Sequence, residues 1–240
     1  NSGVFLRELR SPRAGPFFGG SVTALGGDAS PGDLVVGAPA DGVGGTVSLF
    51  GPETGARDLV IDDPGSANDD RFGAAVTGRG PTLVVGAPGA AAGAGVAYLF
   101  ALSSVAEGGV QISSSIVLRD SNASAGDGFG TAVALVGEAV LVGAPFGDTL
   151  ARDTGLVDVF DRGTAQLVRS LTPPTPTLGA YFGASLAGTG STIAVGAPFD
   201  NQGAGATYVF DATSGSLLRV RTSPNPGTGT IMVDRTISGI

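Results

Sequence analysis

The sequence contains no cysteine, histidine, lysine or tryptophan among its 240 residues. Without cysteine there is neither a disulfide framework nor thiol chemistry, and without histidine the commonest general base and transition-metal ligand is missing. All 13 basic residues are arginine, and against 21 acidic residues they leave a net charge of −8. An acidic surface repels phosphate backbones, so we expect no nucleic-acid partner. No apolar run has the length of a membrane span, so we expect no membrane insertion.

Glycine, by contrast, is abundant, with 42 residues spread along the whole chain. It shows no three-residue period, which excludes a collagen-like chain. Hydrophobic residues make up 42% and charged residues only 14%, which excludes a disordered chain. The length is sufficient for one large domain with a core, and we expect residues 1–240 to form a single domain.

A two-part motif occurs four times. Each copy begins with Phe-Gly, at steps of 54, 57 and 53 residues: Phe18, Phe72, Phe129 and Phe182. A Gly-Ala-Pro follows in each copy, beginning at Gly37, Gly86, Gly143 and Gly196. A Val-rich run then ends on phenylalanine, at Phe50, Phe100, Phe160 and Phe210. The copies span approximately 16–62, 70–118, 127–172 and 180–222.

Each copy contains four strand signals separated by short Gly, Asp and Pro clusters. The first alternates, as in 21–25, and the second is a short apolar run such as 83–85. The third is the run that ends on phenylalanine, and the fourth is looser, at 57–61, 112–118, 166–171 and 216–220. Four antiparallel strands in about 50 residues make one propeller blade. We therefore predict an all-β fold, a β-propeller with four four-stranded blades, rather than a β-helical solenoid, whose turns are nearer 20 residues.

These motifs resemble the FG-GAP repeat, the blade unit of the integrin α-subunit propeller. Copy two carries the pattern in full, RFGAAVTGRGPTLVVGAPGAAAGAGVAYLF, and the resemblance extends over residues 16–222. It implies a propeller whose blades meet through glycine and alanine, with phenylalanine filling the wedge between blades. It implies little about the ligand, because propellers host many functions.

The calcium loop of integrin-like repeats, D-x-D-x-D-G-x-x-D, has no room in copies two to four. Copy one is longer and holds Asp28, Ser30 and Asp33 as candidate ligands, although Gly32 stands where the third ligand should be. Calcium requires six to eight oxygen ligands. We therefore expect no cofactor, because the sequence resembles the calcium-free bacterial FG-GAP proteins. Calcium bound at this loop is the alternative.

The two ends also carry strand-like sequences, at 3–9 and 230–237, and residues 3–7 resemble the fourth strand at 215–219. We hypothesise that these ends add to one another or to an adjacent blade and help to close a ring, which removes exposed edges. The alternatives are a half-ring completed by a second chain, hence a homodimer, and a fragment of a larger ring.

The candidate site lies in the connections after Gly-Ala-Pro, which differ most between copies. These connections supply the candidate ligand-binding residues Phe146, Asp148, Arg152, Asp153, Phe199, Asp200 and Asn201. Paired carboxylates at Asp62-Asp63 and Asp69-Asp70 are a possible sign of a glycosidase, but neighbours in one loop do not define an opposed acid and base. Asp70 also precedes Phe72 as Asp127 precedes Phe129, which indicates a turn cap.

The sequence therefore favours a non-catalytic binding or adhesion module, secreted or at the cell surface, that recognises a protein or polysaccharide through loops on one propeller face. The first alternative is a structural or oligomerisation module. The second is a glycan hydrolase.

Overall fold

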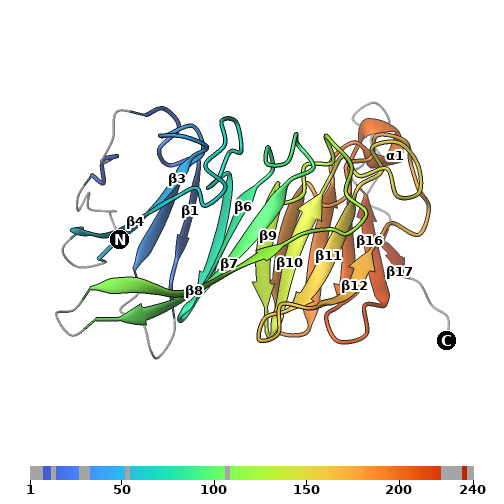
Figure 1. The fold of residues 1–240 in the computed structure, drawn as a ribbon. Coiled ribbons are helices and arrows are strands. Elements are labelled where there is room, and N and C mark those ends of the chain that lie inside the picture. The colour runs from blue at the N-terminus through green and yellow to red at the C-terminus, as the bar shows by residue number, and fades with distance from the viewer. Residues whose placement is uncertain are drawn as a thin grey trace.

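The computed structural model describes residues 8–11, 15–26, 33–51, 55–105, 109–222 and 234–236. Within these ranges the chain forms four antiparallel sheets, and in each sheet the strands follow one another in chain order (Figure 1). Each sheet corresponds to one sequence repeat. The predicted all-β architecture of four four-stranded blades is therefore confirmed.

The strands are short and close to the positions that the repeat pattern predicts. Blade 1 contains β1 (Ser21–Ala24), β2 (Leu34–Ala38), β3 (Thr46–Phe50) and β4 (Arg57–Asp62). Blade 2 contains β5 (Ala75–Arg79), β6 (Thr82–Ala87), β7 (Val96–Ser104) and β8 (Val110–Leu118). Blade 3 contains β9 (Ala132–Val136), β10 (Ala139–Ala144), β11 (Leu156–Asp161) and β12 (Leu167–Leu171). Blade 4 contains β13 (Ser185–Thr189), β14 (Thr192–Ala197), β15 (Ala206–Asp211), β16 (Leu217–Thr222) and a fifth strand, β17 (Asp234–Thr236).

Two features of the fold go beyond the sequence pattern. Strands β7 and β8 have nine residues each, so their hairpin projects past the other blades (Figure 1). The connection after Pro198 forms one helical turn, α1 (Asp200–Gly203), although no helical period marks it. Asn201 and Gln202 have φ values of 52° and 61° in this turn, so the loop is tightly coiled rather than part of a regular helix.

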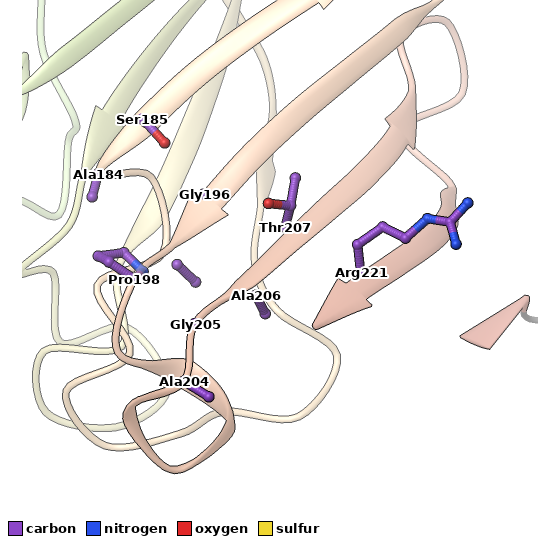
Figure 2. Close-up of a pocket in the computed structure, with 10 residues that line it drawn as sticks. Ala184, Ser185, Gly196, Pro198, Ala204, Gly205, Ala206, Thr207 and Arg221 are labelled. Carbon is purple, nitrogen blue, oxygen red and sulfur yellow. The ribbon is translucent and has the colours of Figure 1, made fainter. Parts of the chain in front are cut away.

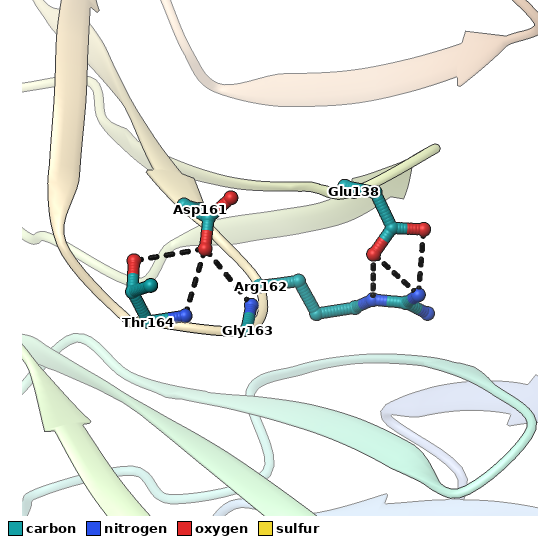
Figure 3. A network of polar contacts seen from close by, with 5 residues as sticks. All are labelled: Glu138, Asp161, Arg162, Gly163 and Thr164. Atoms are coloured by element: carbon teal, nitrogen blue, oxygen red, sulfur yellow. Dashed lines mark hydrogen bonds and ion pairs between the residues drawn. The ribbon is translucent and has the colours of Figure 1, made fainter.

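Aspartate side chains close the turns at the end of the blades opposite the Gly-Ala-Pro connections. Asp161 Oδ1 accepts the backbone N–H groups of Gly163 and Thr164 at 3.1 and 2.7 Å and the Thr164 hydroxyl at 2.8 Å (Figure 3). Beside it, Arg162 donates to both carboxylate oxygens of Glu138 in the β9–β10 turn. These local bonds fix hairpin register without any contribution from a ligand.

The core lies between blades, where apolar faces of neighbouring sheets meet. The phenylalanines of the Phe-Gly motifs in blades 2, 3 and 4 are fully buried there. Each packs edge-to-face against the phenylalanine at the end of the third strand of its own blade, with ring centroids 6.0–6.2 Å apart in the pairs Phe72–Phe100, Phe129–Phe160 and Phe182–Phe210. The expectation that phenylalanine fills the wedge between blades is confirmed.

Glycine allows the blades to approach at their backbones. A Cβ atom on Gly86 would lie 2.0 Å from the carbonyl oxygen of Gly130 in the next blade, and one on Gly143 would lie 2.1 Å from that of Gly183. Such distances are incompatible with any side chain. The glycine of Gly-Ala-Pro is therefore a requirement of the junction.

The four blades form an open row in the described part of the chain. Their first strands, β1, β5, β9 and β13, pack side by side in that order, and blades 1 and 4 lie at opposite ends of the row (Figure 1). Strand β17, from the predicted C-terminal strand 230–237, pairs with β16 at the outer edge of blade 4. Most of the other predicted terminal strand, 3–9, lies outside the described residues, so the closure of a ring by the two ends stays a prediction.

Candidate functional site

The connections after Gly-Ala-Pro lie at one end of the blades, and next to them lies the residue before each Phe-Gly. This residue has a positive φ in every copy: 66° at Phe17, 58° at Arg71, 68° at Gly128 and 56° at Tyr181. The left-handed backbone turns the chain sharply just before the buried phenylalanine. The phenylalanine of Phe-Gly thus lies in the core, whereas the residue before it lies on the loop face.

Three aromatic side chains from blades 3 and 4 meet on this face and form what we call the aromatic row: Phe146, Tyr181 and Phe199. The ring centroid of Tyr181 lies 5.0 Å from that of Phe146 and 5.1 Å from that of Phe199, with both contacts edge-to-face. Phe146 is 40% exposed and Phe199 is 54% exposed. The structure therefore brings together the two phenylalanines named from the sequence and leaves both accessible.

Backbone hydrogen bonds hold the aromatic row in place. The N–H of Tyr181 donates to Asp153 O at 3.2 Å, and the N–H of Phe199 donates to Ala180 O at 3.3 Å. The N–H of Phe146 donates to Asp127 O at 3.2 Å. Each aromatic residue is thus tied to a different loop, which joins the connections of two blades into one platform.

The connection of blade 3 places charged groups beside the row. Asp148 accepts the backbone N–H of Asp153 at 2.8 Å. Arg152 lies 3.5 Å from a carboxylate oxygen of Asp153, with its own side chain mostly exposed. These three predicted residues form one turn next to Phe146, and Asp148 orders it.

Asp148 also lines a pocket of ≈ 320 Å³ together with Asp120, Asp127 and Ser170. Burial raises the pKa of Asp127, and the negative charges of Asp148, Asp120 and Asp153 raise it further against the opposing hydrogen bond from Ser124 N–H. A pKa raised by neighbouring carboxylates indicates a negative local potential. The face therefore combines exposed aromatic rings with an acidic recess.

Comparison with known families identifies the repeats. The family model described as FG-GAP repeat matches residues 115–160 and 166–210. These two segments are FG-GAP repeats. Each matched segment begins on the fourth strand of one blade and ends on the third strand of the next, so both include the connections that build the aromatic row. No curated protein matches the chain.

Asp200 and Asn201, also named from the sequence, lie in the FG-GAP blade 4 connection but in different environments. Asn201 is exposed, whereas Asp200 is buried and accepts the hydroxyl of Tyr208 and the backbone N–H of Asn201. Burial and the Asp200 carboxylate raise the pKa of Tyr208. Both oxygens of Asp200 therefore have partners inside the blade, and its observed role is to hold the loop that carries Phe199.

The candidate calcium ligands lie mostly outside the described residues, as Asp28 and Ser30 do. Asp33 is buried, and burial followed by the charge of Asp58 raises its pKa. The part of the chain that the structure describes contains no group of three metal-ligating side chains. Calcium at this loop stays a prediction for all three residues.

The paired carboxylates between copies one and two lie partly in the interior. Asp63 and Asp70 are buried, whereas Asp62 and Asp69 are exposed. Asp63 accepts the N–H of Gly65 at 3.0 Å. Burial raises the pKa of Asp70, and the neighbouring Asp63 carboxyl raises it further. This arrangement agrees with the turn-cap interpretation of Asp70.

Sequence reasoning missed Tyr181, which joins the two phenylalanines, and Asp120. It named Asp127 only as a turn cap and not as part of the acidic recess. Tyr181 precedes Phe-Gly, at the position that Phe17 and Arg71 occupy in other copies. Alignment of the four copies would have shown that the residue before Phe-Gly varies while Phe-Gly itself does not, which would have indicated Tyr181 as a candidate site residue. Among the described residues, no helix is long and apolar enough to cross a membrane.

Proposed function

We propose that this chain is a non-catalytic binding module, acting outside the cell or at its surface, whose loop face recognises a protein. The observation that carries the proposal is the aromatic row, in which two phenylalanine rings are exposed and fixed by contacts between two blades. Rigid exposed aromatic side chains are typical anchors of protein interfaces. The FG-GAP repeats support a binding role of this kind.

The chemistry of the face favours a ligand with both apolar and basic side chains. Phe146 and Phe199 offer apolar contact, and the faces of their rings attract cations. Asp148 and Asp127 provide negative charge in the adjacent recess. A net charge of −8 would steer a basic segment toward the molecule. A polysaccharide is the alternative ligand, because Asp148 and Arg152 beside the aromatic row can form hydrogen bonds to sugar hydroxyls.

We also propose that the chain has no catalytic activity and requires no cofactor. The interior location of the Asp63–Asp70 pair supports it, since a substrate must reach a catalytic acid and base directly. A sugar-cleaving site also needs two carboxylates on opposite sides of a bound substrate.

Peptide binding and glycan binding can be compared in one experiment. Immobilised peptides that combine arginine with phenylalanine or leucine would be probed with the labelled chain, beside charge-reversed peptides with glutamate and a panel of polysaccharides. We expect binding to the basic peptides, weakened at least tenfold by Phe146→Ala, about the loss expected when a partly exposed aromatic anchor is truncated. Added salt should also weaken it.

Val168→Ala is the matched control, because Val168 is an exposed apolar residue on β12 of the same blade, far from the loop face. It should leave peptide binding unchanged. If the labelled chain bound selectively to a polysaccharide, the proposed ligand would be a glycan instead of a protein. If the chain released sugars from the panel, the proposed non-catalytic function would be wrong.

A further inference from the structure

One buried position in the third strand of a blade differs in chemistry between blade 3 and blades 2 and 4. Blades 2 and 4 have Tyr98 and Tyr208 there, two residues before the phenylalanine that ends the strand, whereas blade 3 has Asp158. Valine opposes both tyrosines on the fourth strand. In blade 3 the opposing residue is Ser170, which donates to Asp158 Oδ1 at 2.5 Å. Blade 3 thus has a polar pair where the other two blades have an aromatic and an aliphatic residue.

Blade 2 shows what the tyrosine does at this position. A Cβ atom on Gly65 would lie 2.7 Å from Asp70 Oδ2, 3.2 Å from the Tyr98 hydroxyl and 3.4 Å from Asp63 Oδ1, so these three groups lie together. Burial raises the pKa of Tyr98, and the charges of Asp63 and Asp70 raise it further. The tyrosine ring therefore fills the space beside two carboxyl groups of the connection that leads into blade 2.

Blade 3 keeps the two carboxyl groups and lacks the ring. Asp63 and Asp70 precede the Phe-Gly of blade 2 by nine and two residues, and Asp120 and Asp127 precede that of blade 3 by the same distances. The side chain of Asp158 is shorter than the tyrosine that it replaces. The pocket of ≈ 320 Å³ lined by Asp120, Asp127, Asp148 and Ser170, which we call the acidic recess, lies beside this shorter side chain.

Asp158 lies at the floor of the acidic recess. It is 1% exposed, and its Oδ2 has no hydrogen-bond partner among the described residues. Its bonded partner Ser170 lines the recess. Burial raises the pKa of Asp158, and the charge of Asp120 raises it further against the hydrogen bond from Ser170, so the two carboxyl groups lie close enough to repel. A buried carboxylate with an unpartnered oxygen is costly, and a cation in the recess would offset that cost.

The lining of the acidic recess offers acceptors and negative charge. Asp120, Asp127 and Asp148 each use one oxygen to accept a nearby backbone N–H at 2.7–2.8 Å. Among the described residues, the other oxygen of each accepts no hydrogen bond. None of the described lining residues is basic. An ammonium group, which has three donors and no acceptor, satisfies such a lining.

The carboxyl groups surround the recess instead of converging on one point. The described part of the chain holds no group of three metal-ligating side chains, and calcium requires six to eight oxygens around one centre. Separated carboxylates match a cation whose charges are themselves separated. Leu156 is buried and lines the same recess, so it offers an apolar wall to the methylene groups of such a cation.

We propose that the acidic recess binds a free aliphatic polyamine, whose ammonium groups pair with Asp120, Asp127 and Asp148 and whose methylene chain packs on Leu156. Ser170 lies between this ligand and Asp158, because its hydroxyl donates to Asp158 and its oxygen accepts from an ammonium group. The polyamine is a ligand separate from the proposed protein ligand.

A pocket on blade 4 shows the contrast in charge. It has a volume of ≈ 530 Å³ and is lined mainly by glycine, alanine and hydroxyl-bearing residues (Figure 2). Its described lining has no carboxylate and includes Arg221. A polyamine finds no opposite charge there, so we expect one bound molecule per chain, in the acidic recess.

The test is calorimetric titration with spermidine at low ionic strength and above neutral pH, with two variants of one residue. Asp158→Asn should weaken binding about tenfold or more, the loss expected when an interaction with a charged group is removed. This variant removes a buried charge and should be at least as stable as the wild type, so unfolding cannot explain the loss. Asp158→Tyr should abolish binding, because the ring fills the recess as Tyr98 fills its counterpart.

Asp161→Asn is the matched control, because it removes the same charge from the same strand at the opposite end of the blade. It should leave spermidine affinity unchanged. Butylamine, methylguanidinium and calcium should each bind more weakly than spermidine. Equal weakening by Asp158→Asn and Asp161→Asn would show only diffuse attraction to an acidic protein and would overturn the site. Unchanged binding by Asp158→Tyr, or tighter binding of calcium or methylguanidinium, would also overturn it. Since no peptide or polysaccharide is present, either result leaves the proposed protein recognition to its own test.

Discussion

At the scale of single residues, a buried carboxyl group makes this fold sensitive to pH. Asp158 lies inside blade 3, where Ser170 donates to its Oδ1 at 2.5 Å. Burial raises its pKa from 3.8 to about 6, against the lowering effect of that hydrogen bond. The folded chain therefore binds more protons than the unfolded chain between these values. The stabilisation from this group is complete below the unfolded pKa and is lost as the pH rises through 6.

We expect Asp158→Asn to increase the free energy of unfolding near neutral pH by up to about 3 kcal/mol and to have little effect near pH 4, as follows from a pKa shift of roughly two units. Urea denaturation at both pH values measures the difference. Loss of stability at neutral pH would mean that the structure requires the carboxylate itself.

Asp161→Asn provides a control of opposite sign. Hydrogen bonds from Thr164 lower the pKa of the exposed Asp161 carboxyl, so its stabilising effect is present above the unfolded pKa and is lost on acidification. This variant should be less stable than the wild type near neutral pH, and the difference should vanish in acid.

At the scale of elements, the glycine of Gly-Ala-Pro can accommodate a side chain in one blade and not in another. An alanine at Gly143 would place its Cβ 2.1 Å from the carbonyl of Gly183, which is backbone and cannot move aside. At Gly196 the nearest atom is the hydroxyl oxygen of Ser185, which can rotate away. We expect Gly143→Ala to cost about 1–3 kcal/mol or more, as overpacking does, and Gly196→Ala to cost less than about 0.5 kcal/mol.

Thermal or urea denaturation followed by circular dichroism gives the two free energies. Equal losses at the two positions would show that the glycine is required within each blade rather than between blades.

The blades were predictable from sequence because their strongest signals are steric and repeat with the strand pattern. Gly86 and Gly143 must be glycine because the backbone of the next blade lies against them. Phe129 and Phe182 fill the space between blades. Each junction therefore requires the same residue types at the same spacing in the sequence. Helix α1 could not be predicted in this way, because a single turn that contains left-handed residues shows no helical period in the sequence.

The site was predictable only in part, because its contacts join residues from different blades. Phe146 and Phe199 were recognisable as aromatic residues outside the repeat positions, and both are exposed. Their contact through Tyr181 depends on how blade 4 sits on blade 3. The burial of Asp200 likewise depends on Tyr208, a residue eight positions along the chain on β15.

At the scale of the whole molecule, stability should vary along the row of blades. Repeat proteins gain stability from interfaces between neighbours. Among the described blades, 2 and 3 each pack against two others, whereas 1 and 4 each pack against one. We expect amides of β2 and β14 to open at lower free energy than those of β6 and β10, which native-state hydrogen exchange measures strand by strand. Uniform protection in the single chain would show instead that the four blades unfold as one unit, in which case each junction transmits stability along the entire row.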